Sequence, residues 1–222
     1  GKSPRPREIS RAAPIAPWNS TVIWTRLIEE VIMDIKGTQT EKNILTAFAG
    51  ESQARNRYNF FAGKARKEGY VQIAKVFEET ADHEKAHASR LFKLLQGGEV
   101  EVTGAFPAGG NGTTEENLRA SAEGEAHEEL EMYPDFAKTA RAEGFEGIAK
   151  TFEAIAVAER QHGKRFSALA DNIATGRVFV RGEKARWQCR NCGYVHEGEE
   201  APKTCLACAH PQAHFEILAE NW

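Results

Sequence analysis

Apolar side chains recur every three or four residues from Thr40 to about Thr175, which is the spacing of helices that bury one face. Breaks in the pattern divide it into four predicted helices, at residues 40–67, 71–96, 114–143 and 146–174. Residues 68–70 and 143–145 are predicted to be tight turns, because each supplies a glycine where a helix C-terminus adopts a left-handed conformation. The stretch 97–113 holds six glycines and Pro107, and we expect it to cross the bundle rather than form a hairpin.

The two predicted helix pairs repeat each other at a constant offset along the chain. Residues 65–70 correspond to 140–145, and Glu84-x-x-His87 corresponds to Glu159-x-x-His162. A duplicated helical hairpin joined by one long connection predicts a four-helix bundle with approximate twofold symmetry. We therefore expect residues 37–175 to be a mainly α domain.

The chain changes character at both ends. Residues 176–222 contain short strand-like runs, turn residues and all four cysteines, and they are predicted to form a small β domain. Residues 1–36 follow no period and hold four of the eight prolines. We expect them to be an extension that is either disordered and non-native, with translation starting at Met33, or a genuine arm with a short amphipathic helix. The mass of the protein purified from its own host distinguishes the two interpretations, because residues 1–32 are present only if the arm is genuine.

Composition narrows the class of protein. With 41% hydrophobic and 27% charged residues, the 222-residue chain has enough apolar surface for a core. Its net charge of -3 supplies no basic field for nucleic acid, and no apolar run is long enough to span a membrane. The N-terminus has no secretory pattern, and the few cysteines occur in metal-type pairs, so we expect a cytoplasmic protein.

Each Glu-x-x-His motif places a carboxylate and an imidazole one helical turn apart, where both can reach one metal ion. A single glutamate precedes each motif by the length of one hairpin: Glu51 precedes Glu84, and Glu125 precedes Glu159 at nearly the same separation. This is the ligand set of ferritin-like di-iron and di-manganese bundles. Each glutamate taken singly could be a surface residue, but six ligands in repeat register favour a di-metal site, and imidazole suits iron.

Three further residues are candidates near this site. Glu128 lies one turn after Glu125, and Tyr58 shares a helix face with Glu51. Tyr133, before Pro134, is the third. Either tyrosine could hydrogen-bond near the metals or be a core aromatic with a satisfied hydroxyl, and the sequence leaves both interpretations open.

The cysteines form two Cys-x-x-Cys pairs, Cys189 with Cys192 and Cys205 with Cys208, separated by twelve residues. This spacing predicts a tetrahedral thiolate site for a single iron or for zinc. A structural zinc ribbon is the alternative. Fusion to a redox-capable di-metal bundle, which needs a source of electrons, favours iron.

These motifs together resemble the rubrerythrin family. The resemblance rests on residues 40–52 (TEKNILTAFAGES), the two Glu-x-x-His motifs, Glu125-x-x-Glu128 and residues 189–198 (CRNCGYVHEG), and it covers roughly 36–222. It implies a ferritin-like di-iron four-helix bundle followed by a rubredoxin-like domain with one iron held by four cysteines. Leu206 departs from the proline usual after the third cysteine, which should affect a turn rather than a ligand.

The resemblance also implies a function. Rubrerythrins are peroxidases that reduce hydrogen peroxide to water in oxidative stress defence, with electrons passing from NAD(P)H through a reductase or rubredoxin to the cysteine-bound iron and then to the di-iron site. It assigns Glu128 as a ligand that replaces His87 when the redox state changes. It further implies a homodimer or larger homo-oligomer.

Two other functions are compatible with parts of the pattern. A ferroxidase or iron-handling ferritin relative would use the same bundle but has no need of a cysteine-iron domain. A metal-stabilised scaffold with zinc in that domain would not be an enzyme. A red ferric-thiolate chromophore would favour electron transfer over the scaffold.

Overall fold

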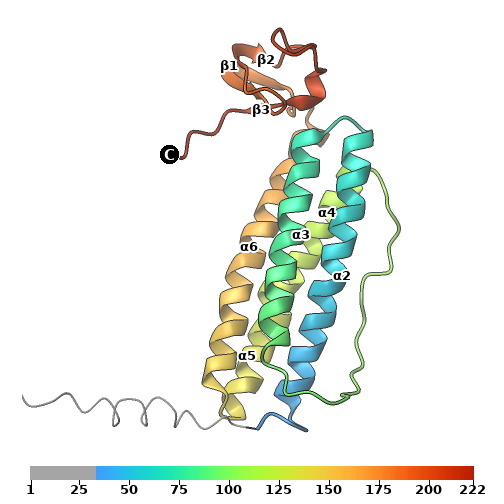
Figure 1. The fold of residues 1–222 in the computed structure, drawn as a ribbon, viewed down its shortest axis with the longest axis vertical. Helices are drawn as coiled ribbons and strands as arrows, with labels where there is room; N and C mark the ends of the chain where they lie inside the picture. The colour runs from blue at the N-terminus through green and yellow to red at the C-terminus, as the bar shows by residue number, and fades with distance from the viewer. Residues whose placement is uncertain (1–33) are drawn as a thin grey trace, which may run out of the picture. The chain divides into compact units, whose positions relative to one another are not determined.

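The computed structural model describes residues 34–222. Both interpretations of the N-terminal extension fall mostly on residues 1–33, which lie outside the described residues. The fold class predicted from the sequence is confirmed: four long helical segments form a bundle, and a small three-stranded domain follows them (Figure 1). Among the described helices, none is long and apolar enough to cross a membrane.

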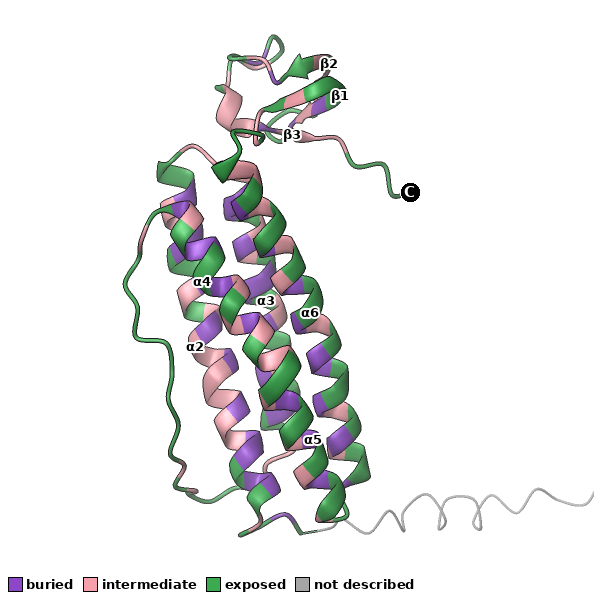
Figure 2. Ribbon diagram, turned by 180° about the vertical axis from the view of Figure 1, so that it is seen from behind, coloured by how far each residue is buried: buried purple, intermediate pink, exposed green. Residues whose placement is uncertain are grey.

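The first hairpin consists of α2 (Gln39–Lys67) and α3 (Val71–Phe92). The second consists of α4 (Thr114–His127), η1 (Glu128–Met132) and α5 (Tyr133–Ala142) in one continuous segment, which returns as α6 (Glu146–Ala174). Residues 97–113 cross along the outside of the bundle between the hairpins, as expected (Figure 1). Buried residues lie on the faces that the helices turn toward one another (Figure 2).

The predicted helix over 114–143 is interrupted by the π-helix η1, which the sequence analysis missed. Pro134 accounts for it. Proline has no N–H to donate to the carbonyl four residues earlier, and its ring clashes with that carbonyl in a regular α-helix. The wider turn over Glu128–Met132 lets the segment continue past Pro134 instead of breaking.

The tight turns carry an additional function in the fold. Gly69 and Gly144 adopt the predicted left-handed conformation, with φ of 85° and 90°. The glutamate before each glycine caps the other hairpin: Glu68 accepts a 2.8 Å hydrogen bond from the N–H of Thr114, and Glu143 accepts bonds of 3.0 and 2.8 Å from the N–H groups of Gln39 and Thr40. Each turn therefore supplies a negative charge to the N-terminus of the partner hairpin's first helix.

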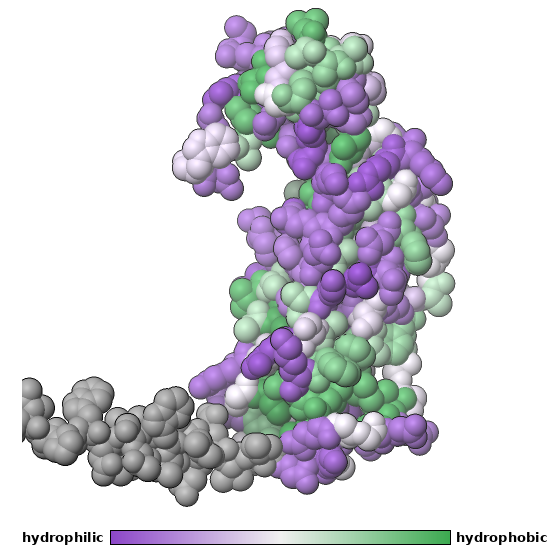
Figure 3. Space-filling model, viewed as in Figure 1, coloured by the Kyte–Doolittle hydropathy of each residue, from purple (hydrophilic) through white to green (hydrophobic). Residues whose placement is uncertain are grey.

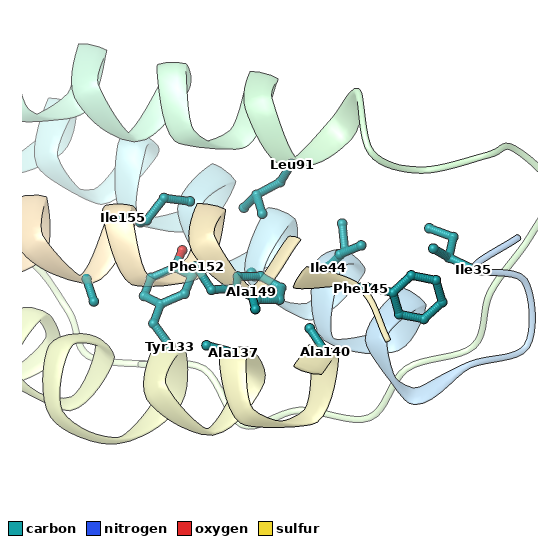
Figure 4. Packing of buried hydrophobic residues seen from close by; sticks show 12 residues of the cluster. Ile35, Ile44, Leu91, Tyr133, Ala137, Ala140, Phe145, Ala149, Phe152 and Ile155 are labelled. Atoms are coloured by element: carbon teal, nitrogen blue, oxygen red, sulfur yellow. The ribbon is translucent and has the colours of Figure 1, made fainter. Parts of the chain in front are cut away.

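Two apolar clusters fill the bundle, one on each side of its polar centre. One is built around Tyr58, Phe61, Phe77 and Phe166. The other includes Ile44, Leu91, Tyr133 and Phe152, and Figure 4 shows these side chains converging from all four helical segments. These clusters hold the helices at fixed spacing, so side chains placed between them have defined positions.

The C-terminal domain is an antiparallel sheet with strand order β2-β1-β3. It comprises β1 (Val180–Cys189), β2 (Val195–Glu200), the short helix η2 (Gln212–His214) and β3 (Phe215–Ile217). Trp187 and Phe215 pack against Cys189 and Cys205 in its small core. A core of this size is typical of a domain that depends on a bound metal for its stability.

Candidate metal centres

The bundle brings the six predicted ligands of the di-metal site together at one level. Glu51 comes from α2, Glu84 and His87 from α3, Glu125 from α4, and Glu159 and His162 from α6. They form two groups, each with its ligand atoms within 4.8 Å of one another: Glu51, Glu84, His87 and Glu159; and Glu84, Glu125, Glu159 and His162. Glu84 and Glu159 belong to both groups, which is the arrangement that bridging carboxylates between two cations require.

The two histidines occupy equivalent places in these groups. Nδ1 of His87 lies 3.0 Å from Glu159, 3.2 Å from Glu84 and 3.4 Å from Glu51. Nδ1 of His162 lies 2.7 Å from Glu159, 3.2 Å from Glu84 and 3.6 Å from Glu125. Gly163 adds to this geometry, because a Cβ at that position would lie 3.3 Å from Cβ of Glu125. The small residue lets α6 approach α4 closely at the site.

The burial of the ligand side chains and the contacts of their oxygens show whether these residues fit a metal pair. The four glutamates that form the two groups are each at most 2% exposed. Among the residues that the structure describes, several of their oxygens form no hydrogen bond and contact only the imidazole nitrogens described above, namely Oε2 of Glu51, Oε1 of Glu84, Oε2 of Glu125 and both oxygens of Glu159. Four buried carboxylates around only two imidazoles are costly unless cations neutralise them. The donor set of carboxylate oxygen and imidazole nitrogen therefore fits two iron or manganese ions.

The site's pKa values show what the same residues do without metal. Burial raises the pKa of Glu51 well above its ordinary range and that of Glu125 to about 8. For Glu84, burial is outweighed by hydrogen bonds from His162 and His87, which lower its pKa to about 2. Burial opposes charge on the imidazoles as well, but the surrounding carboxylates raise the pKa of both to about 12. Metal ligation needs deprotonated carboxylates and a bare imidazole nitrogen, so metal binding must displace these protons.

The two tyrosines satisfy both interpretations that the sequence left open. Tyr58 donates its hydroxyl to Oε1 of Glu125, and Tyr133 donates to Oε1 of Glu51. Each ring also packs among core aromatics; Tyr58, for example, lies 5.2 Å from Phe166 between ring centroids. Burial raises the pKa of both hydroxyls, and the nearby glutamates raise it further, so both tyrosines stay protonated.

The cysteines meet in the C-terminal domain, where their four Sγ atoms lie within 4.8 Å of one another as free thiols. Cys189 and Cys208 are 3.8 Å apart, and Cys192 and Cys205 are 3.6 Å apart. A left-handed residue follows each pair: Gly193, with φ of 79°, and Ala209, with φ of 59°. A backbone hydrogen bond at His210 is the main cause that lowers the pKa of Cys208 to about 6, which favours the thiolate that metal ligation needs.

Comparison with known proteins places this architecture in a family. The family model described as "Rubrerythrin" matches residues 42–170, and the model described as "Rubrerythrin, rubredoxin-like domain" matches residues 187–216. This chain belongs to the rubrerythrin family. It is 63% identical over 188 residues to the rubrerythrin of Nitratidesulfovibrio vulgaris, covering 85% of this chain and 98% of that protein. It is 56% identical over 193 residues to the rubrerythrin of Porphyromonas gingivalis, covering 87% and 96%.

A solved structure supports the same assignment. The structure titled "Fully reduced state of nigerythrin (all ferrous)" matches with a TM-score of 0.55 at 30% identity, covering 84% of this chain and 93% of that one. The departure that we noted from the family's usual sequence, Leu206, lies in the turn between Cys205 and Cys208 and is 82% exposed. Its side chain therefore points away from the thiolates.

Glu128, the ligand that the resemblance to rubrerythrins adds, lies in neither of the two groups of ligand side chains. It opens η1, directly after the helix that carries Glu125, and it is half-buried. Burial, followed by the charges of Glu125 and Glu51, raises its pKa well above the ordinary range. The structure thus pairs His87, rather than Glu128, with the carboxylates of its group.

One residue that contacts this site, His83, was not predicted from the sequence. His83 lies directly before Glu84, and its Nδ1 is 3.1 Å from Nε2 of His162. The signal available was a third histidine beside the first Glu-x-x-His motif, but nothing in the spacing says that it reaches across to α6.

Proposed function

We propose that this chain is a peroxidase that reduces hydrogen peroxide to water at a non-haem di-iron site. The observation that carries the proposal is that one chain combines two kinds of metal site. One is a four-cysteine site, and the other consists of two carboxylate and imidazole groups that have Glu84 and Glu159 in common. Membership of the rubrerythrin family supports iron as the metal in both centres. When bound, the di-iron pair supplies the two electrons that the reduction of one hydrogen peroxide to two waters consumes.

The protein's carboxylates would hold the metals through this change of charge. Glu84 and Glu159 belong to both ligand groups and would serve both metals, whereas Glu51 and Glu125 belong to one group each. Because all four are buried, their negative charge is poorly screened by water and stabilises a higher metal charge more strongly than exposed carboxylates would.

The two tyrosines orient the carboxylates that serve one metal each. The reaction also consumes two protons, and the phenolic O–H groups of Tyr58 and Tyr133 are donors positioned beside the ligand oxygens. Because burial keeps their pKa high, they hold these protons at neutral pH. They therefore position Glu125 and Glu51 and offer protons close to the reacting oxygens.

A cavity of about 220 Å³ borders this region. Its walls include Tyr58 and Glu128 from the site, Met132 and Phe136 from the second hairpin, and Phe106 from the crossing segment. These walls are mostly apolar, which suits a small neutral substrate and limits the entry of ions. Hydrogen peroxide has these properties.

We further propose that electrons reach the bundle through iron in the four-cysteine site, supplied by an NAD(P)H-dependent reductase or a rubredoxin. We also propose a cytoplasmic homodimer or larger homo-oligomer. An exposed apolar surface supports self-association: hydrophobic side chains gather over one end of α2 and α3 (Figure 3), where Phe92 is 61% exposed and its ring centroid lies 5.5 Å from that of Phe48.

Anaerobic stopped-flow spectroscopy tests the peroxidase proposal. The iron-loaded, fully reduced protein is mixed with hydrogen peroxide in one experiment and with oxygen in another. We expect peroxide to reoxidise the protein much faster than oxygen does. Equal rates, or faster reaction with oxygen together with release of mineralised ferric iron, would refute the proposal in favour of a ferroxidase.

A variant pair tests the proposed place of the tyrosines. Tyr58→Phe removes the hydroxyl that contacts Glu125, and Tyr194→Phe, in the C-terminal domain, is the matched control. Loss of a positioned proton donor typically slows a reaction by roughly 10²- to 10⁴-fold. We expect slower peroxide-driven reoxidation in Tyr58→Phe and an unchanged rate in the control.

A further inference from the structure

His83 contacts a ligand of the di-metal site from outside that site. Nδ1 of His83 lies 3.1 Å from Nε2 of His162, the two ring planes are 14° apart, and the ring centroids are 5.2 Å apart. The other nitrogen of His162, Nδ1, faces Glu84, Glu125 and Glu159. His162 therefore lies between the carboxylates on one side and a second imidazole on the other.

Imidazole chemistry decides the direction of this hydrogen bond when a metal is bound. A neutral imidazole has one N–H and one bare nitrogen, and only the bare nitrogen binds a metal. If Nδ1 of His162 is the ligand, the proton is on Nε2 and is donated to Nδ1 of His83. Such outer hydrogen bonds fix the tautomer and ring orientation of a metal-binding histidine and raise its basicity.

The duplicated hairpins make this contact unequal between the two metal positions. In the repeat that aligns the two Glu-x-x-His motifs, His162 corresponds to His87, and the residue that corresponds to His83 is Ala158. Within residues 34–222, the hydrogen bonds and ion pairs that His87 forms run from its Nδ1 to carboxylates, and no imidazole accepts from its Nε2. His87 is also more exposed, at 17% against 4% for His162.

We propose that His83 is a positioning residue that makes the two metal positions unequal. It holds His162 in the ligating tautomer and orientation, whereas His87 has no such support, because Ala158 occupies the place in the repeat that corresponds to His83. This inference rests on the metal-binding part of the proposed function and not on the reaction with peroxide.

Metal titration of four proteins tests the proposal. His83→Leu removes the acceptor, His83→Gln keeps an acceptor oxygen, and Lys85→Leu, an exposed position on the same helix, is the matched control. Zinc binding to the bundle is measured by competition with a chelator, with the four-cysteine site already filled. In His83→Leu we expect one of the two bundle binding steps to weaken by about 10- to 100-fold, while His83→Gln and the control stay near wild type.

Equal affinities of wild type and His83→Leu would overturn the proposal. So would an equal loss in His83→Gln, because ring packing rather than the hydrogen bond would then explain the effect. The converse variant, Ala158→His, gives His87 an outer imidazole, and we expect the other binding step to strengthen; an unchanged step would count against the role assigned to the contact.

A measurement on the unmutated protein covers the case in which a variant does not fold. In the zinc-loaded, nitrogen-15-labelled protein, NMR of the histidine side chains reports which ring nitrogen carries each proton. We expect His162 to be protonated on Nε2 and His83 to be bare at Nδ1. A proton on Nδ1 of His83 would exclude it as the acceptor. None of these measurements uses peroxide, so failure of the peroxidase proposal would leave their result intact.

Discussion

Glu125→Gln should change the pH dependence of stability in the metal-free protein in a defined direction. Burial raises the pKa of Glu125 to about 8, whereas a glutamate in an unfolded chain has a pKa of about 4.3. The folded state therefore binds more protons than the unfolded state between these two values. Its stability is highest below the lower pKa and falls as pH rises toward the higher one.

The size of this effect follows from proton linkage. One such group lowers the free energy of unfolding by about 1.4 kcal/mol per pH unit within the window, or about 2.7 kcal/mol between pH 5 and pH 7. This is an upper bound, because Glu125 shares its environment with His162 and Glu84. The glutamine cannot lose a proton. The amide also changes stability by an amount that does not depend on pH. Between pH 5 and pH 7, the free energy of unfolding of the variant should therefore rise by roughly 1–3 kcal/mol relative to that of wild type.

Urea unfolding followed by far-ultraviolet circular dichroism, on chelator-treated protein at about pH 5, 6 and 7, measures this difference. Glu123→Gln is the matched control, since Glu123 is an exposed residue on the same helix. We expect the control to keep the wild-type pH dependence. A Glu125→Gln variant that also keeps it would show that Glu125 is ionised in the folded metal-free protein, and the reasoning from burial would be refuted.

Three other perturbations have defined outcomes. Glu143→Gln should lower the free energy of unfolding by about 1–2 kcal/mol at neutral pH, because it weakens the cap on α2. The hydrogen bonds from Thr40 lower the pKa of Glu143, so this loss should shrink only as pH falls through that lowered pKa and the wild-type carboxylate protonates; a loss independent of pH would contradict a charged cap. Phe77→Ala should cost about 3–5 kcal/mol in thermal or urea unfolding, since the ring is fully buried among Phe61 and Phe166, and a cost below about 1 kcal/mol would mean that the core collapses around the cavity. Cys205→Ser should abolish the ferric-thiolate absorption while elemental analysis still finds iron in the bundle, and joint loss of both metals would show that the centres are not independent.

Much of the fold follows from local patterns in the sequence. Helical periodicity and two Glu-Gly-aromatic turns indicate four helices, and the internal repeat indicates how the hairpins pair. The ligand stations are predictable for the same reason. Glu51 and Glu84 lie on the two antiparallel helices of one hairpin. Whether they face each other at the same height along the bundle axis therefore depends only on the helix rise per residue and the length of the turn.

The features that the sequence analysis missed depend on contacts between segments that are distant in the chain. The caps formed by Glu68 and Glu143 appear only once the hairpins are packed, because each acceptor serves a helix in the other hairpin. The contact between His83 and His162 likewise requires the relative rotation of α3 and α6. The π-helix did have a local signal in Pro134, but a proline within a helical pattern can also end or kink the helix.

The reciprocal caps bear on how such a bundle could arise. A hairpin alone leaves its own glutamate without a helix N-terminus to cap, and it contributes only one of the two carboxylates that both metal groups share. Two identical hairpins related by a twofold axis would exchange caps and complete both metal positions at once. The ancestral gene, before duplication, therefore needed to encode only half of this bundle, provided that its product assembled in pairs.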